Sequence, residues 1–125
     1  MAFHNKLGAD GEKAAADFLV GKGFIIRETN WRFRHLEVDI IAESEGCRLH
    51  IVEVKTRTSD LHFDPLKSIT KTKIRNLVNA ANIYLRYNNL RCEVQFDVIV
   101  VVGSPGNFKI EYMPRCFYPP LRTYR

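Results

Sequence analysis

The chain has 125 residues, of which 46% are hydrophobic and 26% charged, and its formal net charge is +5. This composition is typical of one globular domain over residues 1–125, and it excludes intrinsic disorder, a collagen-like repeat and a coiled coil. No apolar run approaches the ~20 residues that span a bilayer, and the first residues lack the apolar centre of a signal peptide. We therefore expect a cytoplasmic protein with no membrane partner, and its basic balance favours a polyanion as partner.

The hydrophobic periodicity predicts two helices, one over 6–20 and one from the N-cap candidate Thr70 to about Asn88. It also predicts five strands, over 24–33, 36–42, 48–56, 94–102 and 108–113. The order α-β-β-β-α-β-β indicates a mixed α/β domain, with a mainly antiparallel central sheet flanked by the helices. Residues 114–125 form a tail rich in Pro and Arg, for which no structure is predicted.

The three cysteines, Cys47, Cys92 and Cys116, are widely separated and include no C-x-x-C pair. Their number and spacing predict neither a disulfide framework nor a structural zinc site. The four histidines are equally dispersed. Any metal chemistry is therefore expected to rest on oxygen ligands.

Basic residues are concentrated in the middle of the chain. Between Lys55 and Arg91 there are eight basic residues and only two acidic ones. A solvated helix face would explain part of this pattern, but its position beside an acidic cluster favours phosphate binding. The candidate nucleic-acid-binding residues are Arg57, Lys67, Lys71, Lys73 and Arg75.

The acidic cluster lies on the hairpin formed by the second and third predicted strands. A hairpin centred on Gly46 pairs residues whose numbers sum to 92, so that Asp39 lies opposite Glu53 and Glu37 opposite Lys55. Alternation along the strands then places these four side chains on one face. The opposite face carries apolar side chains, those of Val38, Val52 and Val54.

Two carboxylates at this separation repel each other unless a positive charge compensates them. Lys55 supplies part of that charge, and a divalent cation such as Mg²⁺, which prefers oxygen ligands, would supply the rest. The structural alternative is a surface strand pair with a cross-strand bridge between Glu and Lys. Catalysis is favoured because Glu53 and Lys55 lie between valines, in a strand that is otherwise expected to be buried.

Asp39, followed after a 13-residue gap by Glu53-Val54-Lys55, resembles the signature of the PD-(D/E)-x-K nucleases of the restriction-endonuclease-like superfamily. A larger ordered set, residues 8–12, 30–32, 37–41, 52–57 and 80–85 with Lys73, resembles the bacterial YraN-like family, which is similar in fold to archaeal Holliday junction resolvases. The chain departs from the family in two places: it has Leu36 where Gly is usual and Gln95 where Arg is usual.

The resemblance implies a role for each residue of the cluster. Asp39 and Glu53 would bind Mg²⁺ or Mn²⁺, helped by Glu12 and by the backbone carbonyl of Val54, and Lys55 would position or polarise the attacking water. Two accessory residues are less defined. Glu37 is either a further acid near the metal or a partner for Lys55. Lys73 either reaches a phosphate, which the resemblance favours, or is solvated.

The leading expectation for function is metal-dependent hydrolysis of phosphodiester bonds in DNA. The likeness to resolvases implies branched DNA and a homodimer that cuts two strands symmetrically. The alternative is a non-catalytic nucleic-acid-binding module that keeps the nuclease fold. Outside the cluster, Asp97 is expected to be a buried structural acid, and core packing is favoured over base stacking for Trp31 and Phe33.

Overall fold

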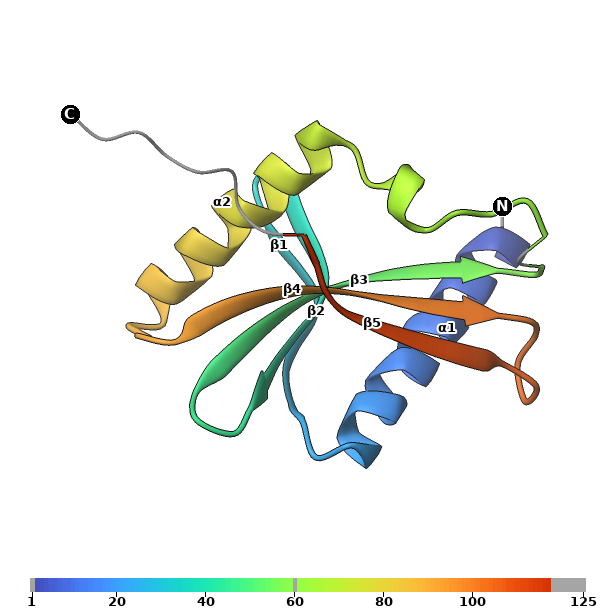
Figure 1. Ribbon diagram of the computed structural model, residues 1–125, viewed down its shortest axis with the longest axis horizontal. Coiled ribbons are helices and arrows are strands. Elements are labelled where there is room, and N and C mark those ends of the chain that lie inside the picture. Colours follow the sequence, from blue (N-terminus) through green and yellow to red (C-terminus); the bar gives the residue numbers. More distant parts are fainter. Residues whose placement is uncertain (1, 60, 118–125) are drawn as a thin grey trace.

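The protein's structure, a computed structural model, describes residues 2–59 and 61–117 (Figure 1). Two helices, α1 (Ala2–Gly21) and α2 (Lys71–Tyr87), and the short 3₁₀ helix η1 (Leu66–Ser68) accompany a sheet. The strands are β1 (Ile25–Phe33), β2 (Leu36–Ser44), β3 (Arg48–Arg57), β4 (Glu93–Val102) and β5 (Lys109–Phe117). The predicted order α-β-β-β-α-β-β is confirmed, and no helix in the described ranges has the length and apolarity needed to span a bilayer.

The five strands form one sheet in the order β1-β2-β3-β4-β5. All neighbouring strands are antiparallel except β3 and β4, which run parallel and are connected through α2. This is the mixed, mainly antiparallel sheet that the sequence predicts. Figure 1 shows the two helices on opposite sides of the twisted sheet.

Each helix buries one face of the sheet. Beneath α2 the core contains Leu77, Ala81 and Tyr84 of the helix together with strand residues such as Ile41 and Ile51. Helix α2 begins where predicted, because the Thr70 side chain accepts a hydrogen bond from the backbone N–H of Lys73, at 3.1 Å.

Beneath α1 the core contains Ala15, Leu19, Ile40, Val52 and Ile99. Helix α1 approaches β3 closely at Gly11, where a methyl group would overlap the side chain of Thr56. The absence of a side chain at position 11 therefore brings the first half of α1, which carries Glu12, against the end of β3.

The expectation of no disulfide is wrong, because Cys47 and Cys92 are joined by one. The cause is the parallel register of β3 and β4, in which Arg48 pairs with Glu93. The two cysteines immediately precede these paired residues, so they are neighbours although 45 residues separate them in the chain. The third cysteine, Cys116, is free.

The chain after Met113 is also more ordered than expected, since β5 continues to Phe117. The backbone N–H of Arg115 donates a hydrogen bond of 3.0 Å to the buried carboxylate of Asp97, which fixes the end of this strand. The remainder of the predicted tail, 118–125, lies outside the described residues.

Asp97 is the buried structural acid that the sequence predicts, with no solvent exposure. With a proton on Nδ1, His50 donates to its Oδ2 at 2.7 Å, and the Tyr112 hydroxyl donates to the same oxygen at 2.8 Å. Gln95 donates to Oδ1 at 2.9 Å. Burial alone would raise the pKa of Asp97, but these hydrogen bonds, that of His50 foremost, hold it below its ordinary value.

Candidate active site

The β2–β3 hairpin has the predicted register close to its turn. Ile41 pairs with Ile51 and Ile40 with Val52, so the numbers of the paired residues sum to 92. The pairing ends at Ile40, however, and does not continue to Asp39. Instead, the backbone N–H of Val54 donates a hydrogen bond of 2.8 Å to Oδ2 of Asp39.

This change from backbone to side-chain pairing means that β2 and β3 separate at Asp39. The side chains of β2 change faces at the same place: Val38 belongs to the core beneath α2, whereas Ile40 belongs to the core beneath α1. The prediction that Val38 shares a face with Val52 and Val54 is therefore wrong, because both of these residues pack beneath α1.

The neighbouring strand shows a matching irregularity. Thr29 pairs with Ile40 and Trp31 with Val38, so Asn30 lies beside Asp39. Asn30 has a φ of 52°, in the left-handed region that asparagine tolerates better than most residues. The positive φ of Asn30 and the separation of β2 from β3 thus occur at the same level of the sheet.

Charged side chains gather around Glu53 where the two strands separate. The Glu53 side chain is 6% exposed, and its Oε2 lies 3.2 Å from Nζ of Lys55 and 3.5 Å from Nζ of Lys73. Lys55 comes from the same strand, whereas Lys73 comes from the first turn of α2. A buried carboxylate requires such partners, because the loss of hydration is otherwise uncompensated.

Asp39 is less well compensated. Burial, followed by the negative charge of Glu53, raises the pKa of Asp39 to about 7. The hydrogen bond from Val54 and the charge of Lys73 oppose this shift without cancelling it. At neutral pH the pair therefore attracts either a proton or a cation.

Glu12 extends the acidic cluster onto α1. Burial raises the pKa of Glu12, a hydrogen bond from the Asn30 side chain lowers it, and the charges of Glu37 and Glu53 raise it further. The three acids predicted to hold the metal, Asp39, Glu53 and Glu12, thus influence one another from two strands and a helix.

The donor set suits a hard cation. The groups that would hold it are the carboxylates of Asp39 and Glu53 and the carbonyl of Val54, because Mg²⁺ is commonly bound by one or two carboxylates while keeping several waters. Among residues 2–59 and 61–117, no three side chains of His, Cys, Asp or Glu converge closely enough to enclose a metal. A fully protein-enclosed site is thus not formed here, and Glu12 fits better as a ligand acting through water.

Glu37 does not lie opposite Lys55, which corrects the predicted pairing. Its Oε2 instead lies 3.2 Å from a guanidinium nitrogen of Arg32 on β1. The reason is that β2 pairs with β1 along its first residues, where it is not paired with β3. Of the two roles left open for Glu37, the partner of Lys55 is excluded. The role of an additional acid fits its electrostatic effect on Glu12.

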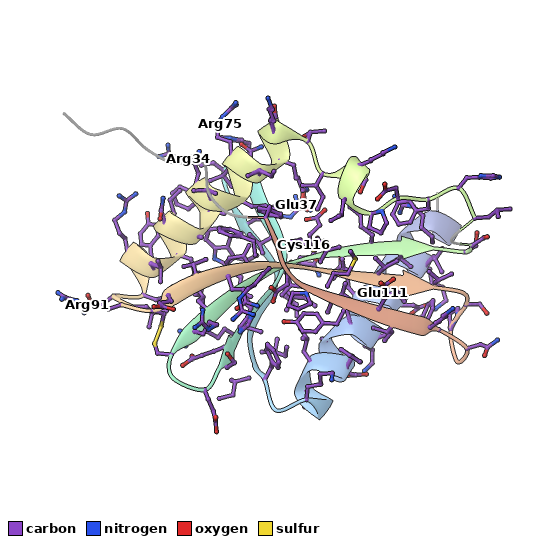
Figure 2. All side chains as sticks on the ribbon, viewed as in Figure 1. Arg34, Glu37, Arg75, Arg91, Glu111 and Cys116 are labelled. Carbon is purple, nitrogen blue, oxygen red and sulfur yellow. A yellow bond between two sulfur atoms is a disulfide. The ribbon has the colours of Figure 1, made fainter. Side chains whose placement is uncertain are left out.

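The predicted phosphate-binding residues differ in how they are used. Lys67 on η1 and Lys71 and Arg75 on α2 are exposed, and Figure 2 shows Arg75 projecting from α2 away from the sheet. Lys73 is committed to Glu53. Arg57 lies over the ring of Phe63, 4.4 Å from its centroid, and donates to the carbonyl of Thr56.

Two features of the site were not predicted from the sequence. The direct ion pair of Lys73 with Glu53 depends on the placement of α2, for which the sequence carries no signal. The role of Asn30 had a weak signal, because asparagine within a β-branched and aromatic strand is unusual and favours a positive φ.

Comparison with known proteins places the chain among relatives of the same length. The family model described as Uncharacterised protein family UPF0102 matches residues 11–101. A UPF0102 protein of Bacteroides thetaiotaomicron is 45% identical, over 97% of this chain and 99% of the relative. One from Flavobacterium psychrophilum is 46% identical (94% and 98%), and one from Chlorobium chlorochromatii is 44% identical (90% and 92%).

The matched region contains both strands of the acidic hairpin, Glu12 and all of α2. The element order and the mixed five-stranded sheet are consistent with a restriction-endonuclease-like core. The agreement over nearly the full length of several relatives establishes that this chain belongs to family UPF0102, the YraN-like family.

Proposed function

We propose that this protein is a metal-dependent nuclease that hydrolyses phosphodiester bonds in DNA, with Mg²⁺ or Mn²⁺ as cofactor. The observation that supports it is the group of Asp39, Glu53 and Lys55 where β2 and β3 separate. There burial, followed by the negative charge of Glu53, raises the pKa of Asp39 to about 7, and the ammonium group of Lys55 lies 3.2 Å from Glu53. Perturbed acids next to a basic group are typical of sites that perform chemistry.

Asp39, Glu53 and the carbonyl of Val54 would hold the cation. When bound, a divalent cation supplies Lewis-acid chemistry, making water more acidic and stabilising the charge that develops on a phosphate. Lys55 would orient the attacking water, with its ammonium group kept in place by the ion pair with Glu53. The hydrogen bond from Val54 fixes the orientation of Asp39.

Lys73 connects the acids to the basic helix. Its side chain is 36% exposed and its ammonium group lies 3.5 Å from Glu53, so it neutralises Glu53 in the absence of a cation and is close enough to the site to contact a phosphate. The exposed Lys67, Lys71 and Arg75 provide the adjoining positive charge. We propose branched DNA as the substrate and a homodimer as the assembly, and both rest on the likeness to resolvases alone.

A non-catalytic nucleic-acid-binding module is the second candidate. The observation favouring it is that Lys55 and Lys73 already pair with the same oxygen of Glu53, which would stabilise the fold without a metal. The two candidates differ in whether Asp39 and Glu53 are needed. A binding module would tolerate their neutralisation or bind DNA more tightly, because a repulsive charge is lost.

The deciding experiment is cleavage of linear duplex, flapped, single-stranded and four-way-junction DNA with Mg²⁺ or Mn²⁺. The wild type is compared with Lys55→Ala and with the matched control Lys109→Ala, which removes an exposed lysine of β5. We expect Lys55→Ala to lose cleavage and Lys109→Ala to retain it. Cleavage that survives Lys55→Ala unchanged would indicate a contaminating nuclease.

The competing outcome is equally specific. Failure to cut any of the four substrates, combined with binding that weakens steeply as salt rises and with no Mn²⁺ uptake, would establish the binding module. Affinity that does not change between low and moderate salt would contradict both candidates, since each requires phosphate contacts.

A further inference from the structure

A groove lies between the β1–β2 turn and the outer side of α2, on the far part of the helix from Lys73. It has a volume of about 540 Å³ and adjoins a second hollow of about 440 Å³ that shares several of its lining residues. Both volumes are within the range of ligand sites. Phe33, Arg34 and Arg86 line both hollows, whereas Asn79 and Asn82 line the first and Tyr87 lines the second.

The floor of the groove is aromatic and partly open to solvent. Tyr87 is 69% exposed, and its ring centroid lies 5.4 Å from that of Phe33. Trp31 stacks against Phe33, at 6.4 Å between centroids, and packs against the core beneath α2. The preference for core packing is thus confirmed for Trp31, whereas Phe33 and Tyr87 present a surface on which a flat ring would stack.

The rim of the groove is basic and hydrogen-bonding. Arg34 lies over the Phe33 ring at 5.3 Å, and Arg86 lines both hollows. The amides of Asn79 and Asn82 supply donors and acceptors, and within residues 2–59 and 61–117 no acidic residue lines either hollow. A planar ring with polar edges attached to an anion would satisfy all of these groups at once.

Arg34 has a backbone conformation that arginine rarely adopts. It lies in the two-residue turn between β1 and β2 with a φ of 57°, a conformation that glycine or asparagine adopts at lower cost. The turn geometry therefore does not explain an arginine here. The guanidinium it brings to the rim of the groove gives a reason for it.

We propose that this groove binds an unpaired nucleotide segment of a single-stranded nucleic acid, with bases stacked on Phe33 and Tyr87 and phosphates contacted by Arg34 and Arg86. Aromatic platforms beside basic side chains are the usual means of binding single strands without sequence preference. The groove is separate from the acidic site, and its occupancy does not require cleavage.

The spacing along α2 relates the groove to the acidic site. Thirteen residues separate Lys73 from Arg86, which corresponds to about 20 Å at ~1.5 Å per helical residue. A nucleic acid that contacts both places would therefore cross the length of α2. The groove would hold an unpaired segment at that distance from the position of Lys73.

The test compares two short ligands in EDTA, so that cleavage plays no part. One is pentathymidylate, and the other is a five-unit sugar-phosphate of the same charge that lacks bases. We expect pentathymidylate to bind at least about fivefold more tightly and to change the fluorescence of Trp31, the single tryptophan, which stacks on Phe33. Equal affinities for the two ligands would overturn the proposal.

Three variants locate the binding. Tyr87→Ala removes an exposed ring and should abolish the preference for the ligand with bases. Arg34→Gly should weaken the binding of both ligands while leaving thermal stability equal or higher, since glycine suits a positive φ. Lys109→Ala, which removes an exposed positive charge from β5, is the charge-matched control and should bind as the wild type does.

Two results would contradict this assignment. If Tyr87→Ala keeps the full preference for bases, the stacking surface lies elsewhere. If Tyr87→Ala instead changes the sedimentation coefficient of the free protein and leaves ligand binding intact, the groove is a contact between two copies of the chain.

Discussion

Two aspartates on this sheet, the buried Asp97 on β4 and the partly buried Asp39 on β2, have pKa values that their surroundings shift in opposite directions. Asp97 accepts hydrogen bonds from His50, Tyr112, Gln95 and the backbone of Arg115, and these hold its pKa below the ordinary value despite its complete burial.

Asp39 accepts a hydrogen bond from the backbone of Val54 and faces the charge of Glu53, and its pKa is raised to about 7. The difference indicates which acid stabilises the fold and which is available for chemistry. An acid whose oxygens are all satisfied by the protein has nothing further to bind, whereas a buried acid with too few partners gains by binding a cation.

The two ends of the hairpin strands also differ. The start of β3 is tied to the start of β4 by the disulfide between Cys47 and Cys92. At the other end β2 separates from β3 at Asp39, and charged side chains from α2 approach. The disulfide would hold the strands in register at one end. At the other end the negative charges of Asp39 and Glu53 are only partly neutralised by the protein.

The largest expected effect is on cleavage. Asp39→Asn keeps the hydrogen bond from Val54 but removes a ligand charge, so nuclease activity should fall by about a thousandfold. Asp97→Asn, measured at a temperature where it stays folded, should lower activity far less. Rates on the best DNA substrate provide the comparison, and equal losses in the two variants would remove the distinction between the acids.

The next effect concerns stability, and here Asp97→Asn is expected to have the larger effect of the two variants. Asp97→Asn would place an amide among four donors, so we expect a loss of about 3–5 kcal/mol in the free energy of unfolding. Asp39→Asn should leave stability unchanged or raise it at pH 7.5, because it relieves a repulsion with Glu53. Urea unfolding measures both. A larger loss for Asp39→Asn would contradict the account.

Reduction of the disulfide should affect only the tied end. Opening a link between residues 45 apart is expected to lower the free energy of unfolding by about 2–4 kcal/mol. Below the melting transition, cleavage should be unchanged, since Asp39 and Glu53 lie at the other end. The Cys47→Ser, Cys92→Ser double variant gives the same comparison without reductant. A loss of activity in the folded, reduced protein would show that the two ends are coupled.

The smallest effect is a pH dependence of stability. Because the folded-state pKa of Asp39 is raised to about 7 from 3.8, the stability this group contributes is present at low pH and is lost as pH rises from about 4 to 7. The change between pH 5 and 7.5 in EDTA should be on the order of 1–2 kcal/mol.

Asp39→Asn should flatten this pH profile. Asp97 acts in the other direction: its pKa is lowered, so its contribution is present above about pH 4 and is lost below that. Urea midpoints of unfolding at several pH values test the predicted directions for Asp39 and for Asp97. A wild-type midpoint that rises from pH 5 to 7.5, with the rise lost in Asp39→Asn, would contradict the prediction for Asp39.

Much of this arrangement could be predicted from the sequence because it depends on local pattern. The element order followed from periodicity and turn residues, and the register near Gly46 followed from the turn itself. The pairing of Asp39 with Glu53 was an extrapolation of that register. It is wrong because β2 and β3 separate at Asp39, beside the positive φ of Asn30, and such a separation depends on both neighbouring strands.

Contacts between distant segments were beyond prediction from one sequence. The disulfide and the pairing of His50 with Asp97 both follow from the register of β3 on β4, which α2 and its flanking loops separate in the chain. No local pattern fixes how two parallel strands slide past each other. The same holds for the approach of Lys73 to Glu53, which depends on how α2 lies on the sheet.

The most direct test of the central claim is Mn²⁺ binding, followed by electron paramagnetic resonance of the free ion. The account predicts uptake by the wild type that strengthens as pH rises through about 7, since the acids must lose their protons to bind. Asp39→Asn should lose this uptake, whereas Glu111→Gln, which neutralises an exposed acid of β5 (Figure 2), should retain it. Wild-type protein that takes up no Mn²⁺, or equal uptake by Asp39→Asn, would contradict a metal site at Asp39 and Glu53.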